Sequence, residues 1–109
     1  MNSEVTMEIV INARPLIVLS KIGRLYLLNK MFSKIYIPSA VLDEINAVNK
    51  KDKKVDLVQI AFEKMIVTNK IAVHGLIGRL HKGQVEVIVG ALENGIKKVV
   101  LDESAAKAL

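Results

Sequence analysis

The stretch Met-Glu-Ile-Val-Ile-Asn-Ala-Arg-Pro, residues 7–15, decides the fold class of this chain. Met7 to Ile11 form a short, largely β-branched run, which is typical of a buried strand. The run ends at Asn12, and Pro15 suits the first turn of a helix, where the N–H that proline lacks has no partner in the helix anyway. The stretch therefore predicts a buried strand that leads directly into a helix.

Outside this stretch, short apolar strands continue to alternate with longer helical segments. Strands are expected at residues 35–37 and 99–101, with a less clear one near 71–73. Helices are expected at 15–22, 24–32, 39–48, 55–66 and 83–94, with another beginning at 103, and the polar residues 49–54 indicate an exposed loop. Gly23 and Gly95 should end two of these helices. Strands separated by helices favour an α/β fold with a parallel sheet.

The composition is that of one folded domain spanning residues 1–109. Hydrophobic residues make up 51% of the chain and aromatic residues 4%, so the core must be aliphatic. The absence of cysteine excludes a disulfide framework, a thiolate metal site and a cysteine nucleophile, and it fits a reducing, cytoplasmic location. No apolar run approaches the roughly 20 residues of a membrane span, and no signal peptide is evident, so no membrane partner is expected.

The charge balance is basic, with 16 Lys and Arg against 11 Asp and Glu and a net charge of +5. Such a surface is compatible with RNA, DNA or an acidic protein as partner. A merely Lys-rich soluble surface explains the same numbers equally well. The shortage of aromatic residues argues against a platform on which single-stranded bases stack.

Polar residues gather where the expected strands end. Asn12 follows the first strand and Asp102 follows the last, while Glu44 lies on the helix after the second. Gln84 and Glu86 lie in the first turns of the helix before the last strand. Ligands of open parallel sheets bind beyond the carboxyl ends of the strands. Oxygen ligands of this kind suit Mg²⁺ or Mn²⁺, which assist the hydrolysis of phosphodiesters.

An ordered set of segments gives this arrangement a family resemblance. In chain order the segments are Ile-Val-Ile-Asn-Ala-Arg-Pro-Leu-Ile (9–17), Ser-Lys-Ile-Gly-Arg-Leu (20–25), Ile-Tyr-Ile-Pro (35–38), Val-Leu-Asp-Glu (41–44), Gly-Gln-Val-Glu-Val-Ile (83–88) and Val-Leu-Asp-Glu (100–103). Together they resemble the successive signatures of the PIN-domain family, in particular the branch of uncharacterised prokaryotic proteins labelled DUF3368. The resemblance covers almost the whole chain, although no single motif is strong.

The resemblance implies a three-layer α/β/α fold with a short parallel sheet. It also implies a Mg²⁺- or Mn²⁺-dependent ribonuclease, and many prokaryotic members resemble VapC toxins of toxin–antitoxin pairs. The implied partners are RNA, an antitoxin-like protein and a second copy of the chain in a homodimer.

The active site of the family is an acidic quartet, which is carried over one position at a time. The first acid falls on Asn12, the second on Glu44, the third on Gln84 with Glu86 as the nearby carboxylate, and the fourth on Asp102 with Glu103 beside it. The resemblance thus implies these six residues as metal ligands and Glu44, Glu86 and Asp102 as the catalytic carboxylates.

The sequence departs from the family pattern in three ways. Asn12 and Gln84 are amides where carboxylates are expected, so they bring no negative charge to a cation. Arg14 replaces a small hydroxyl residue and adds a positive charge nearby. The family usually continues beyond the fourth acid with another helix and strand, whereas this sequence stops at Leu109, so a shortened C-terminus is expected.

Each candidate residue also has a purely structural explanation. Glu44 and Glu86 could be solvated helix residues, and Asp102 and Asn12 could cap helices. His74 and His81 lack a third ligand at a suitable spacing for zinc. Two hypotheses therefore follow. The first is a PIN-like metal-dependent ribonuclease, and the second is a catalytically impaired PIN-like domain that binds RNA or protein.

Overall fold

The sheet is built from four parallel strands with the first strand in a central position. The computed structural model describes residues 7–52, 55–77 and 80–101. The strands are β1 (Glu8–Ile11), β2 (Lys34–Pro38), β3 (Glu63–Met65) and β4 (Lys98–Val100), in the spatial order β3-β2-β1-β4. Ile9 pairs with Ile35 of β2 on one side and with Lys98 of β4 on the other. The predicted parallel sheet is therefore confirmed.

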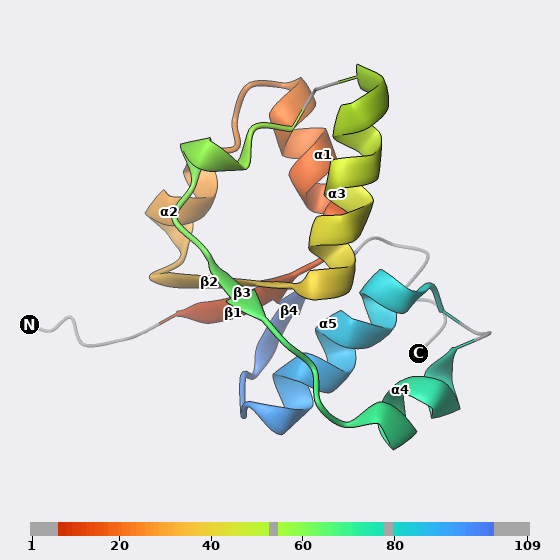
Figure 1. Cartoon of the computed structure of the whole chain (residues 1–109). Coiled ribbons are helices and arrows are strands. Elements are labelled where there is room, and N and C mark those ends of the chain that lie inside the picture. The colour runs from red at the N-terminus through yellow and green to blue at the C-terminus, as the bar shows by residue number, and fades with distance from the viewer. Residues whose placement is uncertain (1–6, 53–54, 78–79, 102–109) are drawn as a thin grey trace, which may run out of the picture.

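Helices cover both faces of this sheet (Figure 1). On one face lie α1 (Ala13–Lys21), α2 (Leu27–Met31) and α3 (Ser39–Asp52), and on the other lie α4 (Lys70–Leu76) and α5 (Lys82–Glu93). A short 3₁₀ helix, η1 (Leu57–Gln59), precedes β3. The predicted three-layer α/β/α architecture is confirmed. Each helix among the described residues is too short or too polar to cross a lipid bilayer.

The core is aliphatic, as the composition predicts. Ile9, Val10 and Ile11 of β1 are completely buried, because helices cover β1 on both faces and strands flank it on both sides. Leu16 of α1 and Val87 of α5 are equally buried and belong to the same hydrophobic cluster. Two glycines end helices as expected: Gly23 follows α1 and Gly95 follows α5, and both have positive φ angles, which glycine adopts without steric cost.

Three local predictions are wrong, and all concern the middle of the chain. Residues 49–52 are the last turn of α3 and not a loop. Residues 55–66 form η1 and β3 instead of a helix, and residues 71–73 belong to α4 instead of a strand. The expected helix over 24–32 is also shorter, since α2 covers only Leu27–Met31. The expected helix from residue 103 lies outside the described residues.

Side-chain amides explain why residues 55–62 are not helical. The Asn49 side chain donates to the carbonyl of Val55 at 2.7 Å and accepts from its N–H at 2.9 Å. The Asn29 side chain does the same with Ala61, at 3.0 Å and 2.8 Å. These two asparagines occupy backbone groups that a helix would need for its own hydrogen bonds. The apolar spacing of this segment therefore predicts burial correctly but not its conformation.

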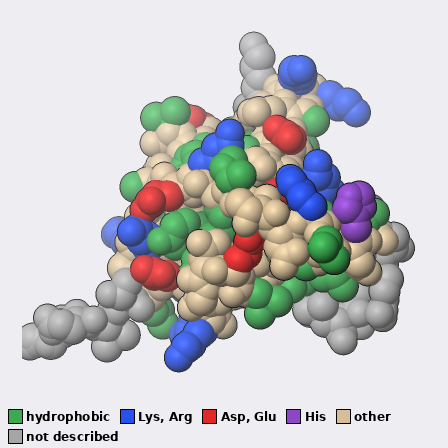
Figure 2. All heavy atoms as spheres, turned by 60° about the horizontal axis from the view of Figure 1, so that its bottom comes forward, with side chains coloured by type: hydrophobic (Ala, Val, Ile, Leu, Met, Phe, Trp, Pro, Cys, Tyr) green, Lys and Arg blue, Asp and Glu red, His purple; other side chains and the backbone are tan. Residues whose placement is uncertain are grey.

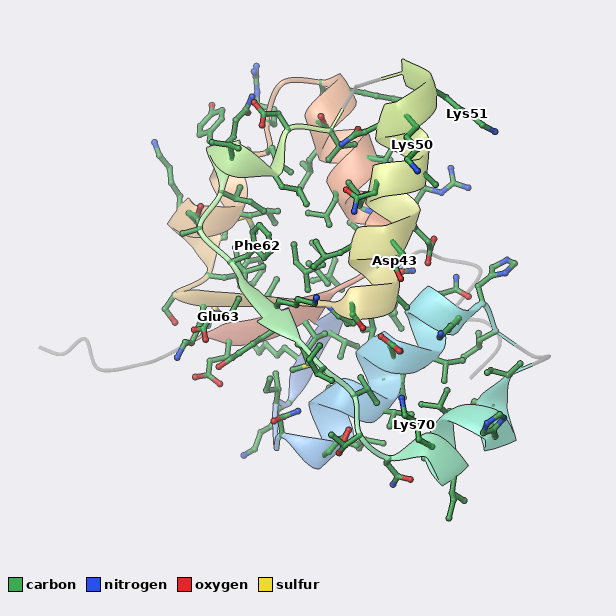
Figure 3. The ribbon with its side chains drawn as sticks, in the orientation of Figure 1. Asp43, Lys50, Lys51, Phe62, Glu63 and Lys70 are labelled. Carbon is green, nitrogen blue, oxygen red and sulfur yellow. The ribbon has the colours of Figure 1, made fainter. Side chains whose placement is uncertain are left out.

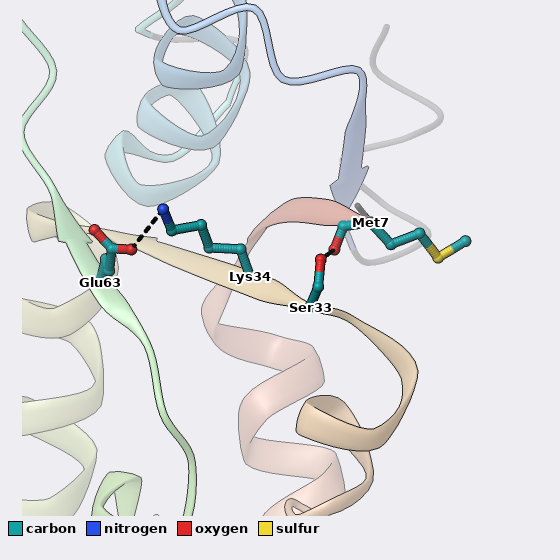
Figure 4. A network of polar contacts seen from close by, with 4 residues as sticks. All are labelled: Met7, Ser33, Lys34 and Glu63. Carbon is teal, nitrogen blue, oxygen red and sulfur yellow. Dashed lines mark hydrogen bonds and ion pairs between the residues drawn. The ribbon is translucent and has the colours of Figure 1, made fainter. Parts of the chain in front are cut away.

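Polar contacts at the sheet surface are minor (Figure 4). Lys34 Nζ lies 3.2 Å from Glu63 Oε2 and joins β2 to the edge strand β3, and the Ser33 hydroxyl donates to the carbonyl of Met7 at 3.1 Å. The hydrogen bond to Glu63 raises the pKa of Lys34 above its ordinary value. Both ionic side chains are about half exposed, so this pair contributes little to the stability of the sheet.

Candidate functional site

Asn12 caps α1 at the carboxyl end of β1. Its Oδ1 accepts a hydrogen bond from the N–H of Ala13 at 2.8 Å, and its own N–H donates to the carbonyl of Val100 at 3.0 Å. The residue is only 2% exposed. These contacts fasten the end of the first strand to the end of β4, so Asn12 lies where sheet-edge ligands bind in parallel sheets.

The first turn of α5 supplies the second group of polar residues. The N–H of His81, which precedes the helix, donates to Gln84 Oε1 at 3.0 Å, and Gln84 is 7% exposed. Gly83 lies directly beneath the exposed Glu44 of α3, because a Cβ at residue 83 would overlap Glu44 Oε1. The carboxylate of Glu44 thus rests on the start of α5, and glycine is what leaves room for it.

These two helix starts line a common pocket of about 260 Å³, here called the strand-end pocket. Its lining consists of Asn12, Ala13, Arg14, Ile17, Glu44, His81 and Gln84. The structure therefore brings together three of the expected site residues: Asn12, Glu44 and Gln84. It adds His81, for which the sequence favours a solvated helix start. The signal in the sequence is its position three residues before Gln84, which is the capping position of α5.

Glu86 lies elsewhere. Its side chain is 5% exposed, and its Oε1 accepts hydrogen bonds from the N–H of Ala40 at 3.0 Å and from the Ser39 hydroxyl at 3.3 Å. Ser39 and Ala40 are the first residues of α3. Glu86 thus supplies the negative charge that favours a helix N-terminus, and it does not line the strand-end pocket.

The surface beside the pocket continues along the seam between α3 and α5. A shallower groove of about 460 Å³ shares Glu44 and His81 with the pocket and adds Asp43 and Lys82. Lys50 and Lys51 lie at the far end of α3, away from α5 (Figure 3). Lys and Arg side chains are dispersed over the face in Figure 2 and are interspersed with acidic ones. On that face the basic charge is therefore not concentrated in one patch.

A family model described as DUF3368, PIN domain, matches residues 8–109, nearly the whole chain. The chain belongs to the PIN-domain family. Searches of the curated proteins and of the solved structures found no match to this chain. PIN domains have a nuclease-like fold, generally use divalent metal ions and often bind RNA and antitoxins. The family resemblance in the sequence is thereby confirmed, together with the nuclease-like fold that it implies.

The described part of this PIN domain does not fit a divalent metal ion. No group of three or more His, Asp or Glu side chains within the described residues could hold one. Glu44 is the one carboxylate among the described residues of the pocket, and Arg14 places a cation there. The side-chain oxygens of Asn12 and Gln84, which would be the ligand atoms, already accept N–H groups at helix starts.

Asp102, which the family resemblance predicts as the fourth acid, and its neighbour Glu103 lie outside the described residues. The assignment of Asn12, Glu44, Gln84, Glu86, Asp102 and Glu103 as metal ligands, and of three of them as catalytic residues, stays a prediction. What the geometry adds is that Asn12, Glu44 and Gln84 share a pocket, while Glu86 is hydrogen-bonded to the start of α3.

Proposed function

We propose that this PIN-domain protein binds RNA at the strand-end pocket and that its ability to cleave RNA is impaired. The observation that carries the proposal is that two amides replace carboxylates in the pocket and that both amide oxygens are already hydrogen-bonded. Asn12 and Gln84 stand where the family has carboxylates, and their oxygens accept backbone N–H groups of α1 and α5. A PIN domain with amides there keeps the shape of the pocket while it loses charge for a cation.

RNA is supported as the partner by family membership, net charge and local chemistry. The family often binds RNA, and the chain carries a net charge of +5. Arg14 lines the strand-end pocket, and Lys82 lines the adjoining groove. Arg and Lys are the residues that contact phosphates of nucleic acids. An antitoxin-like partner and a homodimer rest on the family resemblance alone.

The second candidate function is Mg²⁺- or Mn²⁺-dependent hydrolysis of RNA phosphodiester bonds, as in a toxin of a toxin–antitoxin pair. Two observations favour it. Glu44 is present in the pocket. The Val100 carbonyl accepts the N–H of Asn12, so the end of β4 adjoins the pocket, and Asp102 is two positions later in the sequence. With two carboxylates replaced by amides, any such site would bind divalent ions weakly.

One experiment separates the two functions. Binding of a labelled structured RNA is measured by fluorescence anisotropy in EDTA and in Mn²⁺, and cleavage is followed on gels under the same conditions. We expect binding in EDTA that weakens with salt, and no cleavage. Metal-dependent cleavage that disappears in Asp102→Asn would establish the ribonuclease. Absence of both binding and cleavage, from protein with a cooperative unfolding transition, would contradict both functions.

A further inference from the structure

The strand-end pocket lies at the positive ends of two helices. Its lining includes the first two residues of α1, which is 9 residues long, and His81 and Gln84 at the start of α5, which is 12 residues long. A helix N-terminus carries roughly half a positive charge, because its first N–H groups point outward unpaired. Glu44 rests on the start of α5 and offsets that charge there. At the start of α1 the side chain that lines the pocket is instead a cation, Arg14.

Asn12 provides an independent observation. The side chain is almost completely buried, and its Oδ1 is occupied by the N–H of Ala13. The described residues offer no hydrogen-bond acceptor to its Nδ2, although the residue lines the pocket. No fully buried side-chain nitrogen or oxygen among them lacks a partner, so Nδ2 keeps some exposed surface, and the pocket is the space that Asn12 lines. Buried amide donors are normally paired, and this one faces the place where a ligand would sit.

The backbone of α1 adds another donor at the same place. The N–H of Arg14 has no acceptor within the described part of the chain, and Pro15 has no N–H to compete for a ligand. Asn12 Nδ2, the Arg14 N–H and the Arg14 guanidinium are thus three donors at one helix start, one of them charged. Such a set suits the oxygens of a phosphate and repels a metal cation.

We infer that the strand-end pocket binds a phosphate group of RNA directly at the start of α1, without a bridging divalent cation. The inference rests on the proposed function, because it names the part of the RNA that the pocket takes. It also reverses the expected role of Glu44. In a metal site this carboxylate would strengthen ligand binding, whereas beside a directly bound phosphate it weakens binding by repulsion.

The test uses the whole chain labelled with ¹⁵N, titrated in EDTA with inorganic phosphate and with short oligoribonucleotides that carry either a 5′-phosphate or a 5′-hydroxyl. We expect saturable shifts of the Arg14 amide and the Asn12 side-chain amide. Arg14→Ala should weaken binding about tenfold or more, and it should lower the salt dependence of RNA binding by about one phosphate contact. The control Arg24→Ala removes the same charge beyond the other end of α1 and should bind as the wild type does.

Two nearly isosteric variants sharpen the test. Asn12→Asp keeps an oxygen that caps α1 but replaces the donor Nδ2 with a negatively charged oxygen, so phosphate affinity should fall about tenfold or more. Glu44→Gln removes the repulsion, so affinity should rise severalfold. A fall in affinity in Glu44→Gln, or binding that needs Mn²⁺ and is lost in EDTA, would overturn the inference.

The ligands separate the remaining outcomes. Tighter binding of the 5′-phosphorylated strand would identify a terminal phosphate, and equal binding of the two strands would identify an internal one. RNA binding that is unchanged in Arg14→Ala and Asn12→Asp would sink the inference and leave the proposed function standing. Binding of inorganic phosphate that depends on both residues, without any binding of RNA, would leave the phosphate pocket and overturn the proposed function.

Discussion

The N-termini of α3 and α1 both carry a partial positive charge, but their surroundings are opposite. The start of α3 is closed by the buried carboxylate of Glu86, which accepts from Ser39 and Ala40. The start of α1 opens into the strand-end pocket, which is lined by the cation Arg14 and by Asn12, whose Nδ2 has no acceptor among the described residues. A helix N-terminus favours a neighbouring anion. Within the described residues α3 receives its anion from Glu86, whereas the phosphate that we infer would supply the anion at the start of α1.

The comparison also separates two carboxylates that look alike in the sequence. Glu86 is buried and holds α5 against α3, while Glu44 is exposed, lines the pocket and rests on Gly83. The contacts of Glu86 hold the first turn of the helix that carries Glu44. Changes at Glu86 should alter the stability of the fold, and changes at Glu44 should alter what the pocket binds.

The largest expected effect comes from removing the carboxylate of Glu86 from the N-terminus of α3. Glu86→Ala leaves the buried N–H of Ala40 and the Ser39 hydroxyl without their acceptor, and it should lower the free energy of unfolding by about 2 to 3 kcal/mol. Urea denaturation measures the change. Glu86→Gln keeps one acceptor oxygen and should lose about half as much, while Glu44→Ala should change stability by less than about 0.5 kcal/mol. Equal losses in all three variants would break the comparison.

The next effect comes from making the strand-end pocket acidic. The double variant Asn12→Asp, Gln84→Glu adds two negative charges beside Glu44 and keeps both capping oxygens. We expect Mn²⁺ to bind at least tenfold more tightly than to the wild type, which corresponds to about 1.4 kcal/mol. Isothermal titration calorimetry measures the affinity. Adding Glu44→Gln should remove much of the gain, and a gain that survives this third change would place the metal outside the pocket.

A smaller effect is expected where the two helices meet. Gly83→Ala places a Cβ against Glu44 Oε1 and forces the carboxylate away from the start of α5. Alanine gains about 1 kcal/mol of helix propensity over glycine, which offsets the displacement. We therefore expect a stability within about 1 kcal/mol of the wild type, with a clear change in the carboxyl ¹³C shift of Glu44. An unchanged shift would mean that Glu44 does not rest on residue 83 in solution.

The smallest effect concerns an exposed carboxylate, in contrast to the buried Glu86. Glu93 accepts hydrogen bonds from the hydroxyl and the N–H of Thr68, and these lower the pKa of Glu93 below its ordinary value. A lowered pKa means that the contact stabilises the fold above the unfolded pKa and is lost as the pH falls through the folded one. Thr68→Ala should therefore be less stable than the wild type at neutral pH and equally stable in acid. A difference that persists in acid would point to lost packing instead.

The sequence predicts those parts of the fold in which local signals and burial agree. The β-branched run of β1, the capping residue Asn12, and the glycines at 23 and 95 each act on their own neighbours, so their effects are readable in a single chain. The same holds for α5 and for the polar residues at the strand ends. Three of these, Asn12, Glu44 and Gln84, do meet in one pocket.

The remaining features depend on contacts between distant residues. The apolar spacing of residues 55–62 predicts a helix, but hydrogen bonds from the side chains of Asn29 and Asn49 prevent it. No local feature of the sequence identifies these asparagines as partners of Ala61 and Val55. Glu86 lies two positions from Gln84 in the sequence, but its side chain is buried against α3, where its Oε1 accepts from the N–H of Ala40. Such pairings arise only after the layers have packed, which is why the sequence does not reveal them.

The central place of β1 has a consequence for the order of folding. The hydrogen bond between Asn12 and the Val100 carbonyl joins positions near opposite ends of the described chain, and the pocket likewise combines the start of α1 with the start of α5. Contacts with large sequence separation form slowly, because the intervening chain must be ordered first. During synthesis β1, β2 and the helices between them emerge early, and they lack the pocket until α5 and β4 follow. Because α5 also contributes Val87 to the hydrophobic core, a nascent chain completes its core and its capacity to bind a ligand at this edge together, after α5 and β4 have been made.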